Sequence, residues 1–123
     1  MAAFQIAVAD SPFPSLDPIR DVVSRIGGEV QLASEATPEA ILRVARDADA
    51  VLVTYGQITG DIIRQLTKSR IISRMGIGTD NIDIEAATKA GMVVTKVPDY
   101  CLDEVSDHTM ALLLGSHRHL YEM

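Results

Sequence analysis

The stretch "RIISRMGIGTDNIDIEAATKAGMVVTKV", residues 70–97, decides the fold of this chain. A run rich in isoleucine at 70–75 leads into two glycines, a helical pattern follows at 84–91, and a second apolar run completes the stretch. This is the order of a strand, a loop, a helix and a second strand, which places two parallel strands side by side through a right-handed crossover. Asp83 before the helical pattern and Gly91 at its end are residue types that begin and end helices.

The same alternation of strand and helix patterns continues on both sides of this stretch. Short, largely apolar runs predict strands at 4–10, 29–33, 50–54, 70–75 and 92–97. A capping side chain precedes proline at Asp17-Pro18 and at Thr37-Pro38, and Thr59 precedes a third helical pattern. We therefore predict an α/β fold: a doubly wound, flavodoxin-like five-stranded parallel sheet flanked by helices, with ligands at the carboxyl ends of the strands.

The composition of the chain excludes several functional classes. Its 123 residues suffice for one domain, and 47% hydrophobic with 23% charged residues is typical of a soluble globular protein. No apolar run approaches the roughly 20 residues that span a bilayer, and the N-terminus lacks the pattern of a signal peptide. We therefore expect a cytoplasmic protein without a membrane partner. A net charge of −6 argues against nucleic acid as a partner.

Spacing alone leaves three interpretations of the glycine loop. Gly76 and Gly78, with Asp99 about 20 positions further on, fit a dinucleotide fingerprint, but Asn81 stands where its third small residue belongs. Alternatively, both glycines accommodate positive φ in a turn, and Asp83 and its polar neighbours cap the next helix. In the third interpretation, the glycines expose consecutive backbone N–H groups to an anion such as a carboxylate. Spacing does not separate the last two interpretations.

A series of motifs in the second half of the chain points to one family. The motif G-x-G-x-D-N-I-D occupies 76–83, A-A-x-x-x-G occupies 86–91, V-P occupies 97–98 and E-V-x-D-H occupies 104–108. In this order and spacing, the motifs resemble the D-isomer-specific 2-hydroxyacid dehydrogenases. That family also contains phosphoglycerate dehydrogenases and the C-terminal-binding transcriptional co-repressors. The resemblance spans the whole chain and is strongest from Arg74 onward.

The resemblance implies a catalytic, substrate-facing domain over residues 1–101 and, over 102–123, a helix leading toward an NAD-binding domain. In such enzymes, backbone N–H groups of the glycine loop bind the carboxylate of a small 2-hydroxy or 2-keto acid. By match, these groups belong to Gly76, Ile77 and Gly78. Ile77 and Val105 also match positions that contact the nicotinamide cofactor, which is NAD(H) or NADP(H) in the full-length enzymes.

The resemblance also assigns roles to three other loop residues. Tyr55 and Gly56 match the loop that closes over the substrate, and Tyr100 matches a substrate-facing tyrosine of some D-lactate-type members. For Tyr100 the alternative is a tyrosine packed at the domain edge with its hydroxyl in water. Cys101 is interpreted as the cap of the last helix, where it and Glu104 mimic a capping box.

Several groups that hydride transfer requires in this family find no match before Met123. They are the G-x-G-x-x-G segment, the substrate-binding arginine, and the glutamate and histidine of the proton-transfer pair. We therefore expect the N-terminal substrate-binding part of an NAD-dependent D-2-hydroxyacid dehydrogenase, with no catalytic residue, no metal site and no activity by itself. A non-catalytic, co-repressor-like regulatory module of the same family is the alternative. The wide apolar surface of the last helix predicts a homodimer.

Overall fold

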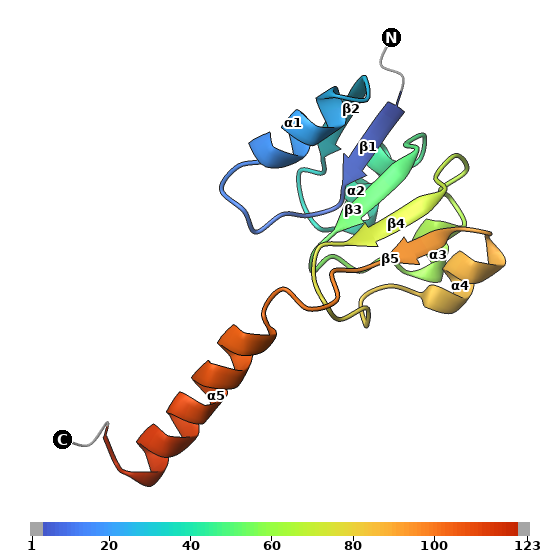
Figure 1. Cartoon of the computed structure of the whole chain (residues 1–123). Coiled ribbons are helices and arrows are strands. Elements are labelled where there is room, and N and C mark those ends of the chain that lie inside the picture. The colour runs from blue at the N-terminus through green and yellow to red at the C-terminus, as the bar shows by residue number, and fades with distance from the viewer. Residues whose placement is uncertain (1–3, 121–123) are drawn as a thin grey trace.

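The computed structural model describes residues 4–120 and contains a five-stranded sheet flanked by helices. The strands are β1 (Phe4–Val8), β2 (Gly28–Leu32), β3 (Ala50–Val53), β4 (Ile71–Arg74) and β5 (Val93–Thr95). The helices are α1 (Asp17–Ser24), α2 (Pro38–Ala45), α3 (Gly60–Ile63), α4 (Ile84–Lys89) and α5 (Leu102–His117). All neighbouring strands are parallel, in the order β2-β1-β3-β4-β5 (Figure 1), which confirms the predicted flavodoxin-like arrangement.

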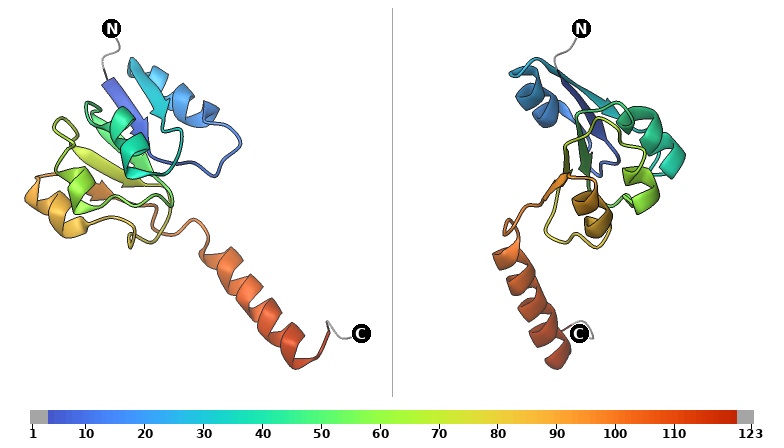
Figure 2. Two further views of the ribbon diagram at one scale, coloured as in Figure 1. Left: turned by 180° about the vertical axis from the view of Figure 1, so that it is seen from behind. Right: turned by 90° about the vertical axis from the view of Figure 1, so that its right-hand side faces the viewer.

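The crossovers between parallel strands place helices on both faces of the sheet. The right-hand view of Figure 2 shows α1 on one face and α2, α3 and α4 on the other. The core lies between the sheet and these three helices, and its large, fully buried side chains are Ile41, Val51, Val53, Ile58, Ile62, Ile63 and Ile72. The central strand β3 (AVLV) is apolar throughout, as expected in a sheet that carries helices on both faces.

Side-chain hydrogen bonds confirm two of the predicted helix caps. The Thr37 Oγ1 accepts a hydrogen bond from the Ala40 N–H at 3.4 Å at the start of α2. The Asp83 Oδ1 accepts the Ala86 N–H at 2.9 Å at the start of α4. Each bond satisfies a backbone donor that the first turn of a helix leaves unpaired. Thr59 occupies the predicted position before α3, but its side chain makes no capping hydrogen bond.

Two other predicted caps are wrong. Asp17 is the first residue of α1, and the cap position belongs to Leu16, whose side chain is buried. Packing of this leucine in the domain shifts the helix start by one residue, and the Asp17 N–H donates to the Ser15 Oγ at 2.9 Å. Cys101 occupies the position before α5, but its side chain accepts no hydrogen bond from the helix. The capping box predicted with Glu104 therefore does not form.

The last helix projects away from the sheet (Figures 1 and 2). The helical pattern over 102–120 forms α5 as far as His117, and His119 then adopts a positive φ of 53°. Every residue of α5 except Gly115 is exposed. Its exposed large apolar side chains are Leu102, Val105, Met110, Leu112, Leu113 and Leu114. Residues 121–123 lie outside the described residues.

No helix in the described part of the chain has both the length and the apolar character that a membrane span requires.

The amino-terminal edge of the sheet carries a carboxylate whose ionisation contributes to stability. The Asp49 Oδ2 accepts the Gln5 N–H at 2.8 Å and pairs with the Lys68 Nζ at 2.9 Å. The hydrogen bond from Gln5, followed by the one from Lys68, lowers the pKa of Asp49 below its ordinary value of 3.8. The folded protein therefore holds this carboxylate ionised at a lower pH than the unfolded chain does.

We expect the stabilisation from Asp49 to be complete above pH 3.8 and to be lost as the pH falls through the lowered pKa of the folded state. The unfolded chain, in which Asp49 has its ordinary pKa, binds the proton first as the pH falls. Urea unfolding of the wild type and of Asp49→Asn, near neutral pH and well below pH 3.8, measures this. The difference in unfolding free energy between the two proteins should shrink in acid; a constant difference contradicts the expectation.

Candidate functional site

The carboxyl ends of the parallel strands meet at one edge of the sheet, close to the segment that leads into α5 (Figure 1). Two clefts open there. The first, called the aromatic cleft below, measures about 400 Å³ and is lined by Pro12, Phe13, Thr54, Tyr55, Ser73, Arg74, Met75, Val97 and Tyr100. The second, called the glycine-loop cleft, measures about 190 Å³ and is lined by Thr54, Tyr55, Gln57, Arg74, Gly78, Asp80 and Asn81. In open parallel sheets, ligands bind at this edge.

Arg74, the last residue of β4, lines both clefts. Its Nε is buried and has no hydrogen-bond partner among the described residues. A buried guanidinium nitrogen without an acceptor is costly, and carboxylates and phosphates are the acceptors that guanidinium groups bind best. The sequence motifs did not single out this residue, although a charged side chain at the end of an otherwise apolar strand was a signal for it. Arg74 is therefore a candidate for binding an anion.

The loop glycines do not adopt positive φ, so the second interpretation of the loop is wrong on this point. The described glycines with positive φ are Gly27 (72°) and Gly91 (71°). The guanidinium of Arg74 lies over Gly76, in the space that a Cβ atom there would take, although this flexible side chain could move aside. A Cβ atom on Gly78 would meet only the Asp80 Oδ2, at 3.4 Å. The arginine therefore packs against the first glycine of the motif.

The glycine loop also presents unpaired backbone donors. The N–H groups of Gly76, Ile77 and Gly78 donate no hydrogen bond within the described part of the chain. The loop itself is anchored, since the preceding Met75 N–H donates to β3 at 2.8 Å and the Gly76 carbonyl accepts the Val97 N–H at 3.0 Å. Consecutive N–H groups on an anchored loop suit a small anion, which favours the third interpretation.

Side chains from two other segments hold the loop after β3. The Asp10 carboxylate accepts the Thr54 and Tyr55 N–H groups, each at 2.8 Å. The Asn81 Nδ2 donates to the Thr54 and Gly56 carbonyls at 3.3 and 2.8 Å. Asn81 stands where a dinucleotide fingerprint has its third small residue, and its side chain instead binds the loop after β3. This arrangement favours an anion site over a dinucleotide site.

The structure brings some of the predicted site residues together and separates others. Tyr55 and Tyr100 both line the aromatic cleft, with exposed fractions of 69% and 67%. Gly78 lines the glycine-loop cleft. Ile77 is half-buried on the same loop but lines neither cleft. Val105 lies on the exposed helix α5 and also lines neither cleft.

Tyr100 lines the aromatic cleft, and its hydroxyl lies within hydrogen-bonding reach of the Cys101 side chain. The Cys101 side chain raises the pKa of Tyr100 above its ordinary value of 10.0, first through a hydrogen bond and then through Coulombic repulsion. The phenol therefore stays protonated at neutral pH. Most of Tyr100 is exposed, so its ring is not packed against the domain edge, and its substrate-facing role stays a prediction.

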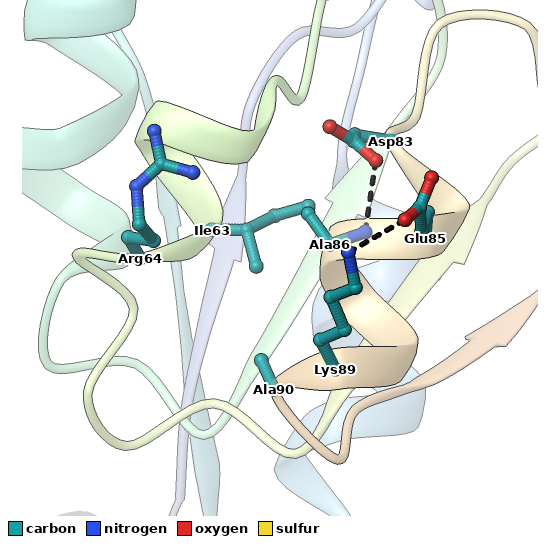
Figure 3. A pocket seen from close by; sticks show the side chains of 7 residues that line it. All are labelled: Ile63, Arg64, Asp83, Glu85, Ala86, Lys89 and Ala90. Atoms are coloured by element: carbon teal, nitrogen blue, oxygen red, sulfur yellow. Dashed lines mark hydrogen bonds and ion pairs between the residues drawn. The ribbon is translucent and has the colours of Figure 1, made fainter.

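A separate hollow of about 440 Å³ lies between α3 and α4 (Figure 3). It is lined by Ile63, Arg64, Asp83, Glu85, Ala86, Lys89 and Ala90. Its charged side chains already have partners. The Lys89 Nζ pairs with the Glu85 carboxylate at 2.5 Å, and Asp83 caps α4. Arg64 pairs with Asp61. None of these residues lines either cleft, so this hollow is not part of the candidate site.

Comparison with known sequences agrees with this geometry. The family model "D-isomer specific 2-hydroxyacid dehydrogenase, catalytic domain" matches residues 6–119. The D-3-phosphoglycerate dehydrogenase of Methanocaldococcus jannaschii is 40% identical over 94 residues, which are 76% of this chain and 18% of that protein. The glyoxylate reductase of Pyrococcus furiosus is 34% identical over 87 residues, which are 70% of this chain and 26% of that protein. The chain thus spans between 18% and 26% of the length of these relatives.

Comparison with solved structures gives the same result. The NAD+-bound 3-phosphoglycerate dehydrogenase of Entamoeba histolytica matches with a TM-score of 0.74 and 35% sequence identity. The match covers 79% of this chain and 33% of the other. Fold, glycine loop and family model agree over nearly the whole sequence. The chain therefore belongs to the D-isomer specific 2-hydroxyacid dehydrogenase family, to whose catalytic domain residues 6–119 correspond.

Proposed function

We propose that this chain is the substrate-binding part of an NAD-dependent D-2-hydroxyacid dehydrogenase, which interconverts 2-hydroxy and 2-keto acids by hydride transfer. The observation that carries the proposal is the glycine loop, which has three unpaired N–H groups, and Arg74, whose guanidinium lies over Gly76 and whose buried Nε is unpaired. Both kinds of donor suit a carboxylate. The names of the related dehydrogenase and reductase support an acid of this class.

In this proposal, the glycine loop and Arg74 bind the carboxylate, and the remainder of the acid extends into the aromatic cleft between Tyr55 and Tyr100. The arginine adds a charge-assisted hydrogen bond to those of the loop. Because backbone N–H groups and a guanidinium both bind the carboxylate, the neighbouring C2 atom of the acid is restricted in position. This C2 atom is the one that loses or gains the hydride. The contribution of this chain is therefore binding and orientation of the acid.

The described residues do not form a dinucleotide site of their own. Asn81 is engaged with the loop after β3, and the helix that follows the glycine loop, α4, has only 6 residues. NAD(H) or NADP(H), when bound in the full-length enzyme, supplies or accepts the hydride. Ile77 is the better candidate for a contact with it, because this half-buried apolar side chain lies on the carboxylate loop. Val105 stays a prediction.

A homodimer through α5 is part of the same proposal. The helix carries apolar side chains at three consecutive positions, 112–114, which point in different directions around a helix, and all three are exposed. Exposed apolar surface of this extent on a soluble domain marks an interaction site.

The assignment of the carboxylate site is tested by titrating the 123-residue chain with glyoxylate, pyruvate and hydroxypyruvate while following backbone amide signals. We expect shifts at Gly76, Ile77 and Gly78 and dissociation constants in roughly the millimolar range. Affinity is limited because each net hydrogen bond contributes only about 1 kcal/mol, or about 1.5–3 kcal/mol to a charged group. Pyruvamide, which lacks the carboxylate, should produce no such shifts.

Arg74→Met should weaken binding of the three acids about tenfold or more, because it removes a charged donor. Arg70→Met is the matched control: this exposed arginine adjoins the opposite end of β4 and lines neither cleft. Ligand-induced shifts confined to other loops, or equal affinities of the two variants, would refute the assignment of the carboxylate site.

A further inference from the structure

The loop after β3, residues 54–58, is hydrogen-bonded to neighbouring segments at Thr54, Tyr55, Gly56 and Ile58. The Asp10 carboxylate, two residues beyond β1, accepts the N–H groups at the beginning of the loop, and the Asn81 side chain donates to carbonyls of the loop. At its end, the Ile58 N–H donates to the Asn81 carbonyl at 2.8 Å, and the Ile58 carbonyl accepts the Asp83 N–H at 3.0 Å. The loop thus bridges the segments that follow β1 and β4.

We propose that Asp10 and Asn81 are positioning residues that clamp this loop as a fixed wall of both clefts, instead of a segment that closes over the ligand. The inference rests on the proposed function, since the wall it describes lines the proposed acid site. Opening the loop would leave backbone groups and a carboxylate unpaired at partly buried positions, and such groups are expensive to leave unpaired. A carboxylate that accepts two N–H groups is a particularly strong tie.

The clamp determines what the loop offers to a ligand. The N–H groups of Thr54 and Tyr55 are occupied by Asp10, so they are unavailable to a carboxylate. The exposed side chains of Tyr55, which lines both clefts, and of Gln57, which lines the glycine-loop cleft, remain for a ligand. Gly56 permits this geometry because a Cβ atom there would lie only 3.1 Å from the Asp10 Oδ1. The backbone N–H groups left for an anion are then those of the glycine loop.

Asp10→Asn tests the clamp, because an amide oxygen can accept at one side while its NH₂ group faces the second backbone N–H. The chain offers a closely matched control in Asp49→Asn. Asp49 also accepts a backbone N–H at 2.8 Å from a strand 44 positions away in the sequence, but at the opposite edge of the sheet. Both variants remove one negative charge, so any general effect of charge on the binding of an anion is common to them.

Two readouts separate the clamp from the proposed function. The first is the hydrogen-exchange rate of the Thr54 and Tyr55 amides without ligand, which we expect to be about tenfold or more higher in Asp10→Asn than in Asp49→Asn. The second is the dissociation constant for pyruvate, which should be about fivefold larger in Asp10→Asn than in Asp49→Asn. If Asp10 had a purely structural role, both variants would have a lower free energy of unfolding, but their dissociation constants for pyruvate would be equal.

The outcomes are distinguishable. If pyruvate shifts no amide of the glycine loop in the wild type, the proposed function fails, and the exchange rates alone decide whether the loop is clamped. If the wild type binds pyruvate but Asp10→Asn exchanges and binds like Asp49→Asn, the clamp is overturned. If Asp10→Asn does not fold, Asn81→Asp takes its place, because it replaces the donor amide by an acceptor of equal size. Unchanged exchange of the loop in that variant overturns the proposal.

Discussion

Mixed with NADH and glyoxylate, pyruvate or hydroxypyruvate, the 123-residue chain is expected to leave the NADH unoxidised. Hydride transfer to a 2-keto acid needs a positioned nicotinamide and a proton donor beside the carbonyl oxygen. Among the described residues, no histidine lines either cleft, and His108 and His117 lie on the projecting helix α5. A positioned acid–base group alone contributes roughly a hundred- to ten-thousand-fold in rate. The weak binding expected of the carboxylate site does not compensate for this.

The measurement is the loss of NADH absorbance at high protein concentration, compared with a heat-denatured sample. Arg74→Met distinguishes a contaminating enzyme from this chain, because a contaminant is unaffected by the substitution. Turnover that exceeds the denatured control and disappears in Arg74→Met would contradict the expectation. It would show that these residues carry a complete hydride-transfer site.

Replacing Leu113 by glutamate is expected to convert a dimer of this chain into a monomer. Leu113 lies on α5 with 60% of its surface exposed, between two further exposed leucines. Burying a leucine side chain is favourable by roughly 1.5–3 kcal/mol, and a symmetric dimer contains two copies. Loss of both copies corresponds to about 3–6 kcal/mol, or a dissociation constant larger by two to four powers of ten. Sedimentation equilibrium over a range of concentrations measures the change.

Val22→Glu is the matched control for this experiment. Val22 lies on α1 and is also 60% exposed, so the substitution introduces the same charge at an equally exposed apolar position. It should leave the association unchanged. A wild-type chain that sediments as a monomer at all concentrations, or equal weakening by the two substitutions, would exclude α5 as the dimer surface.

The pattern of elements could be predicted because its causes are local. Short apolar runs separated by helical patterns require parallel strands with helical crossovers, and the right-handedness of these crossovers restricts the order of the strands. Capping by Thr37 and Asp83 was predictable for the same reason, since each side chain bonds a backbone group only three residues away. The cap of α1 was missed because packing of Leu16, a tertiary contact, determines where that helix begins.

The sequence by itself determined the class of fold, the order of the strands and the glycine loop with its family motif, because periodicity and motif spacing are properties of neighbouring residues. Only the tertiary structure decided how the loop is used. The approach of Arg74 to Gly76 depends on a rotamer, and the bonds from Asp10 to Thr54 and Tyr55 join residues 44 and 45 positions apart. Contacts of this kind depend on the register of β1, β3 and β4 in the sheet, which no local pattern encodes.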